Sequence, residues 1–95
     1  MFMIIILLST SNFYCQDEWT VSTFNIRYDN PSDPLTWDDR KKEVVRAIAY
    51  FDIVGLQEVL PHQLKYIKNS LPLNSSYSVT RFGSQDGEAC PIFWK

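Results

Sequence analysis

Hydrophobic and polar positions along the chain form blocks that predict strands and helices in alternation. The segment WTVSTFNIR, residues 19–27, is rich in β-branched and aromatic side chains and predicts a strand. The apolar run FDIVGLQEVL contains a second predicted strand, residues 52–59, which is apolar enough to be buried on both faces. Residues 37–51 carry apolar side chains at helical spacing, with Thr36 or Asp38 as the cap. Strand, helix and strand in this order favour a crossover that makes the two strands parallel neighbours.

The second half of the chain continues the pattern with a helix and a hairpin. Pro61 can open the helix at its first position, and Pro72 stops it. Residues 76–82 and 90–95 read as strands on either side of the Gly-containing turn 83–88, which predicts an antiparallel hairpin. The sequence therefore predicts the α/β class.

The first residues stand apart from this pattern. Phe2–Leu8 is an uninterrupted apolar run, far shorter than the ~20 residues needed to cross a bilayer. The run suits the core of a secretory signal peptide at residues 1–15, which would make the protein secreted or periplasmic. No Lys or Arg precedes the run, and a buried first strand is the alternative. Export would permit a disulfide between Cys15 and Cys90, although two unrelated thiols are the preferred interpretation.

Composition sets bounds on size, order and partners. The chain has 95 residues, of which 45% are hydrophobic and 15% aromatic, and this suits one small ordered domain or a part of one. The formal net charge of −2 gives no basic footprint of the kind that binds nucleic-acid backbones. Contact with a single phosphate inside an active site is still compatible with that charge.

Two polar side chains occur at the ends of predicted strands that are otherwise apolar. Asn25 lies near the end of the first strand, and Glu58 lies near the end of the second. Because open α/β sheets bind ligands at the carboxyl ends of their strands, we expect the two side chains to lie together there. Carboxylate and amide oxygens suit Mg²⁺, with Mn²⁺ as a possible substitute. The alternative is that Glu58 caps the next helix and Asn25 ends its strand in a turn.

Four stretches of the sequence resemble the endonuclease/exonuclease/phosphatase superfamily, in particular its secreted bacterial members and the nocturnin-like deadenylases. They are TFNIRYDNP (23–31), W-x-x-RK (37–41), DIVGLQEVLPHQL (52–64) and DGEACPIFWK (86–95). The resemblance implies a DNase-I-like four-layer α/β sandwich, of which residues 19–95 would form the N-terminal half. It also implies magnesium-dependent hydrolysis of phosphoesters, with Asn25 and Glu58 as catalytic and metal-binding residues and Glu58 as the main metal ligand.

Three other residues have candidate roles that the sequence leaves open. Arg27, two residues after Asn25 and expected on the same strand face, could bind a substrate phosphate, or it could be a surface charge. The resemblance places Glu88 close to the cleft, and a turn acid beside a strand is the alternative. His62, the single histidine, does not match the catalytic histidine of the family and is expected to be exposed in the first turn of a helix.

The resemblance is incomplete at the C-terminal side. Relatives are longer, and their later motifs supply an Asp-x-Asn pair, a further Asp and an Asp-His element that do not occur before Lys95. We therefore expect a truncated domain that is inactive alone and leaves one sheet face uncovered. A catalytically dead remnant that binds metal or phosphate weakly is the alternative. The substrate could be nucleic acid, phosphoinositide or phospholipid; we expect no stable membrane span and a monomeric full-length relative.

Overall fold

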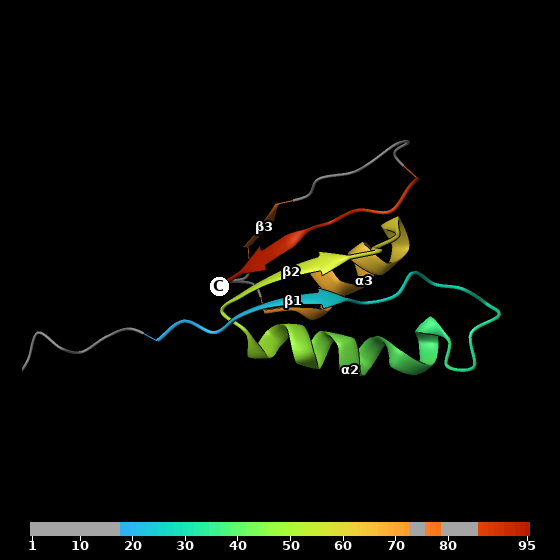
Figure 1. Cartoon of the computed structure of the whole chain (residues 1–95), viewed down its shortest axis with the longest axis horizontal. Coiled ribbons are helices and arrows are strands. Elements are labelled where there is room, and N and C mark those ends of the chain that lie inside the picture. The colour runs from blue at the N-terminus through green and yellow to red at the C-terminus, as the bar shows by residue number, and fades with distance from the viewer. Residues whose placement is uncertain (1–17, 73–75, 79–85) are drawn as a thin grey trace, which may run out of the picture.

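The computed structural model describes residues 18–72, 76–78 and 86–95 of the chain. Within these residues the elements follow the order β1, α2, β2, α3, β3 and β4 (Figure 1). The predicted signal peptide at residues 1–15, with Cys15, lies outside the described residues, as do residues 83–85 of the predicted hairpin turn. Neither described helix is long and apolar enough to cross a membrane.

A mixed four-stranded sheet forms the centre of the described part of the chain. Its strands, in spatial order, are β1 (Val21–Asn25), β2 (Ile53–Gln57), β4 (Ile92–Trp94) and β3 (Ser76–Ser78). The β1–β2 pair is parallel, and the β2–β4 and β3–β4 pairs are antiparallel, which confirms the predicted neighbours and hairpin. Strands β1, β2 and β4 are shorter than predicted. β1 ends before Arg27 because the backbone there has a positive φ of 63°, which lies outside the extended conformation of a regular strand.

The two helices that link these strands are α2 (Trp37–Tyr50) and α3 (Pro61–Ser70). Thr36 is the N-cap of α2, as one of the two predicted alternatives. Its backbone N–H and its hydroxyl donate to Asp39 Oδ2 at 2.9 and 2.8 Å, which fixes the start of the helix. The helix α3 begins at a proline, as predicted.

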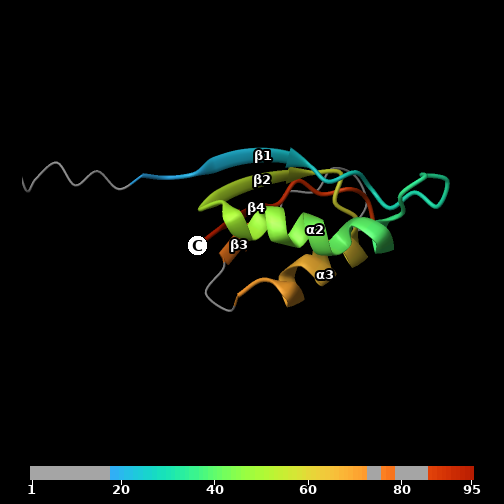
Figure 2. The ribbon, with the colours of Figure 1, turned by 90° about the horizontal axis from the view of Figure 1, so that it is seen from below.

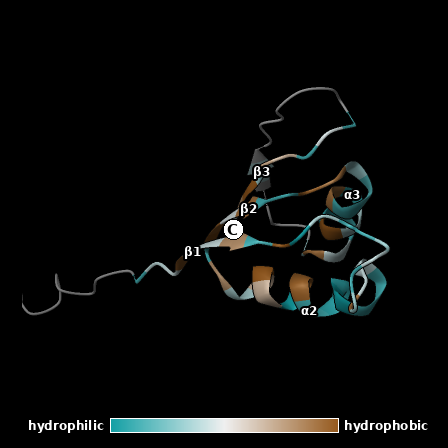
Figure 3. Cartoon of the chain, turned by 45° about the vertical axis from the view of Figure 1, so that its right-hand side comes forward, coloured by the Kyte–Doolittle hydropathy of each residue, from teal (hydrophilic) through white to brown (hydrophobic). Residues whose placement is uncertain are grey.

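Both helices cover the same face of the sheet (Figure 2). The core on that face contains Val54, Leu56 and Phe93 of the sheet, Val44 and Ile48 of α2, and Leu64 and Ile67 of α3. Figure 3 shows apolar and polar stretches alternating along α2, as a helix with one buried side requires. The opposite sheet face carries Val21, Ile92 and Trp94, which are 64%, 47% and 39% exposed. No described element covers that face.

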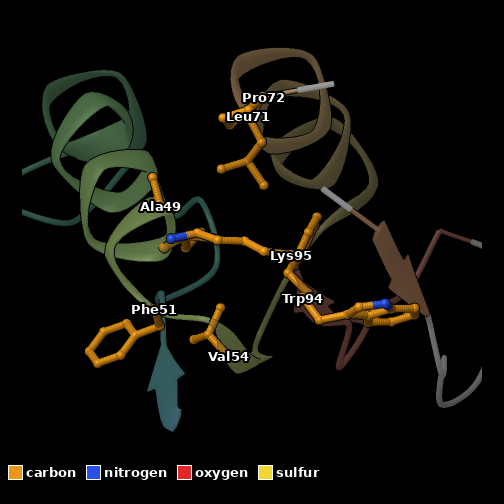
Figure 4. A pocket seen from close by; sticks show the side chains of 9 residues that line it. Ala49, Phe51, Val54, Leu71, Pro72, Trp94 and Lys95 are labelled. Atoms are coloured by element: carbon orange, nitrogen blue, oxygen red, sulfur yellow. The ribbon is translucent and has the colours of Figure 1, made fainter. Parts of the chain in front are cut away.

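A small apolar hollow lies at the end of the sheet where β2 begins (Figure 4). Its lining includes Ala49, Phe51, Val54, Leu71 and Trp94. The volume is about 20 Å³, which is room for about one water molecule. We therefore regard the hollow as a gap in packing and not as a ligand site.

Candidate functional site at the carboxyl ends of β1 and β2

The side chains of Asn25 and Glu58 are in contact at one edge of the sheet. Parallel pairing sets Asn25 opposite Gln57, so Glu58 follows one residue beyond the end of β2. Asn25 Nδ2 donates a hydrogen bond to Glu58 Oε1 at 3.0 Å. The crossover that the sequence predicts thus places the two polar side chains next to each other.

Glu58 lies in a β-bulge, which the sequence did not predict. The β2–β4 ladder pairs Gly55 with Ile92, and the next bridge joins Val59 to Ala89. Between these two pairs the β2 side advances four residues while the β4 side advances three, so one residue is extra. Glu58 has a φ of 60°, the left-handed conformation that usually falls to glycine in a bulge of this kind.

The bulge directs the Glu58 carboxylate away from the core. In a regular strand, successive side chains alternate between faces, so Glu58 would follow Leu56 onto the helix-covered side. Glu58 instead bonds to Asn25, on the open face of β1. Gln57 lies on that same face, where its Nε2 donates to Thr23 Oγ1 at 3.0 Å. Two consecutive side chains therefore lie on the open side of the sheet. This explains how an apolar, buried strand can end in a carboxylate.

A second left-handed residue completes the site from the end of β1. At Arg27 the backbone turns, and the Arg27 N–H donates to Asn25 Oδ1 at 2.8 Å. The next N–H, that of Tyr28, donates to Glu58 Oε2 at 3.3 Å. Each non-glycine residue in this conformation costs on the order of 1–3 kcal/mol, and residues strained in this way cluster at functional sites. Both left-handed non-glycine residues among the described ones belong to this site.

The Glu58 carboxylate is ionised at neutral pH. The hydrogen bond from Asn25 and the one from the Tyr28 N–H lower its pKa below the ordinary value, while partial burial opposes them. Each carboxylate oxygen accepts one of these bonds, so about two of its four or so lone-pair positions stay free. An anionic oxygen pair with free lone pairs fits a hard divalent cation. No group of three His, Cys, Asp or Glu side chains surrounds a common point within the described residues.

Arg27 does not lie on the same strand face as Asn25, contrary to the prediction from the sequence. Its guanidinium group forms two hydrogen bonds to the Asp33 carboxylate, both at 3.0 Å, and lies 4.4 Å from the centre of the Tyr28 ring. That expectation was wrong because the left-handed turn ends the strand before Arg27. The ion pair with Arg27 also lowers the pKa of Asp33.

Glu88 and His62 lie near the same end of the sheet. Glu88 precedes Ala89, which is buried and bridged to Val59, so the exposed Glu88 faces away from the core. His62 occupies the first turn of α3 with its side chain 56% exposed, as expected. His62 Nε2 lies 2.8 Å from Asp29 Oδ2, which connects α3 to the loop that follows β1.

Two polar side chains that sequence reasoning passed over support the turn at Arg27. Gln63 is completely buried, and its Nε2 donates to the Arg27 carbonyl at 3.1 Å. Arg40 Nη1 donates to the Ile26 carbonyl at 2.6 Å. A sequence signal existed for both: Gln63 stands beside Leu64 on the apolar side of a helix, and Arg40 lies in W-x-x-RK.

Comparisons with known proteins identify the family and a similar fold. Among curated proteins, none matches the chain significantly. A solved structure described as a functionally unknown conserved protein from Enterococcus faecalis V583 matches 80% of this chain with a TM-score of 0.67 and 26% identity. The chain spans about a third of that protein, 31% of its length. The Endonuclease/Exonuclease/phosphatase family matches residues 22–95, most of the sequence. The chain therefore belongs to the endonuclease/exonuclease/phosphatase family.

Proposed function

We propose that the chain carries the metal-holding part of a magnesium-dependent phosphoester hydrolase site. Glu58 would bind the cation, Mg²⁺ or Mn²⁺ in its place, and Asn25 would hold the carboxylate in position. The observation that carries this proposal is the bulge at Glu58, which turns an ionised carboxylate out of a buried strand at the cost of backbone strain. Family membership supports the reaction class, hydrolysis of a phosphoester by a nuclease or phosphatase.

The hydrogen bonds give Asn25 an orienting role. Its Oδ1 accepts the Arg27 N–H, and one Nδ2 hydrogen goes to Glu58, so the amide cannot rotate without losing both bonds. The amide nitrogen, not the oxygen, therefore faces the carboxylate. The second Nδ2 hydrogen is left to donate to a substrate oxygen. A cation held by Glu58 would polarise the phosphoryl group.

Glu58 alone supplies too little for efficient hydrolysis, and we propose that the isolated chain is inactive. A positioned general base typically contributes ~10²- to 10⁴-fold. The one histidine of the chain, His62, is paired with Asp29. Binding of metal or phosphate without turnover is the alternative function of the chain alone. The substrate of the site would be a phosphoester of nucleic acid, phosphoinositide or phospholipid.

A metal titration tests the proposal. We expect Mn²⁺, measured by electron paramagnetic resonance or calorimetry, to bind the full chain and to bind Glu58→Gln at least about tenfold more weakly, because the replacement keeps the shape but removes the charge. Glu43→Gln is the matched control, since Glu43 is 69% exposed on α2 and pairs with Arg46. Equal Mn²⁺ affinity in Glu58→Gln and the wild type would refute Glu58 as the ligand.

A further inference from the structure

The turn from Ile26 to Tyr28 is held by the two helices beneath it. Its left-handed residue, Arg27, directs two successive N–H groups at Asn25 and Glu58. The carbonyl groups of the same turn need partners of their own, because an unpaired buried carbonyl is costly. Those partners come from side chains of α2 and α3, not from the sheet.

Gln63 connects the ends of both strands. Its Oε1 accepts the Leu60 N–H at 3.0 Å, two residues after Glu58, and its Nε2 donates to the Arg27 carbonyl at 3.1 Å. The side chain is completely buried, and both ends of its amide are satisfied. A buried glutamine with both bonds made fixes the distance between the segments it joins.

Arg40 holds the same turn from α2. Its Nη1 donates to the Ile26 carbonyl at 2.6 Å, its Nη2 to the Arg27 carbonyl at 3.4 Å and its Nε to the Leu35 carbonyl at 3.2 Å. All three contacts go to backbone oxygens, and the planar guanidinium spans two consecutive peptide groups. Arg40 and Gln63 thus converge on the carbonyl of the strained residue.

We propose that Gln63 and Arg40 are positioning residues that hold the left-handed turn at Arg27 and, through its N–H groups, the Asn25–Glu58 pair. Neither side chain is required to touch substrate or metal. The inference rests on the proposed function only for its consequence on metal affinity. The backbone restraint itself is independent of any ligand.

Hydrogen–deuterium exchange of the full chain tests the restraint directly. In Gln63→Met the side chain keeps its length but loses both bonds, of which one reaches the turn at the Arg27 carbonyl. We expect exchange at the Arg27 and Tyr28 amides to rise about tenfold, the effect of losing that one hydrogen bond. Exchange at Leu56 should rise only as much as global stability falls. Ile48→Val, a core truncation far from the turn, is the control for that global loss. Arg40→Lys, at a half-buried position, is a second variant in case Gln63→Met does not fold.

Mn²⁺ affinity supplies the second readout. We expect it to fall about tenfold in Gln63→Met and to stay unchanged in Ile48→Val, because only the former loosens the carboxylate. A wild type that binds no Mn²⁺ would overturn the proposed function, while the exchange result would still decide the restraint. Exchange at Arg27 and Tyr28 that rises no more in Gln63→Met and Arg40→Lys than in Ile48→Val would overturn the role of both residues.

Discussion

Two carboxylates flank β2, and they differ in how the backbone presents them. Asp52, just before the strand, accepts the Thr20 N–H and the Thr20 hydroxyl on Oδ2 at 2.8 and 2.9 Å. Glu58, just after the strand, likewise accepts two hydrogen bonds from the β1 side. Asp52 does so without a positive φ, whereas Glu58 needs a bulge and a φ of 60°.

The comparison separates a carboxylate that serves the fold from one that serves a site. Asp52 uses one oxygen to fasten the start of β1 to β2, next to an apolar hollow that offers nothing to a ligand. Glu58 divides its two bonds between both oxygens, whereas both bonds to Asp52 go to Oδ2. Each carboxylate accepts two bonds, so the two differ in their backbone conformation and not in the number of free lone pairs. Of the two residues, only Glu58 has the strained, left-handed backbone conformation, and joining two strands does not require such strain. Proteins tolerate such strain where function depends on it.

The largest change in stability is expected from the regular stretch of β2 that joins the two ends. Leu56 is fully buried in the helix-covered core, and Leu56→Ala should lower the free energy of unfolding by about 2–5 kcal/mol. Gly55 faces the open side, and an added Cβ would meet nothing within 4 Å. Gly55→Ala should therefore change stability by less than about 1 kcal/mol. Urea unfolding of both variants measures the contrast, and similar losses would mean that the open face is packed.

A smaller effect is expected in the acid unfolding of the chain. The bonds from Thr20 lower the pKa of Asp52 below its ordinary value of 3.8. A carboxyl whose pKa is lowered on folding stabilises the fold fully above its ordinary pKa, and this contribution disappears as the pH falls through the lowered value. Between neutral pH and pH 2, the melting temperature of Asp52→Asn should therefore fall by less than that of the wild type. An identical loss would show that Asp52 does not tie the strands in solution.

Much of the fold follows from the sequence because periodicity and chain connectivity determine it. The helical spacing, the crossover and the hairpin predicted the parallel β1–β2 pair, the antiparallel β3–β4 pair and the contact between Asn25 and Glu58. The bulge could not be predicted, since strict alternation sends Glu58 into the core and no glycine marks the left-handed position. The prediction that Arg27 lies on the same strand face as Asn25 was wrong because a second left-handed residue, at Arg27 itself, follows the end of β1. The contact of Gln63 with the turn was not predicted, because its partner, the Arg27 carbonyl, is distant in the sequence.

The most direct test of the central claim compares glycine at the two ends of β2 by thermal unfolding. Glu58→Gly loses two hydrogen bonds but gives the left-handed position the residue that prefers it, so we expect a melting temperature close to that of the wild type. Asp52→Gly loses the bonds to Thr20 and gains no relief of strain, so we expect a clear decrease. A Glu58→Gly protein that melts as far below the wild type as Asp52→Gly would contradict the claim that the backbone strain at Glu58 serves the site and not the fold.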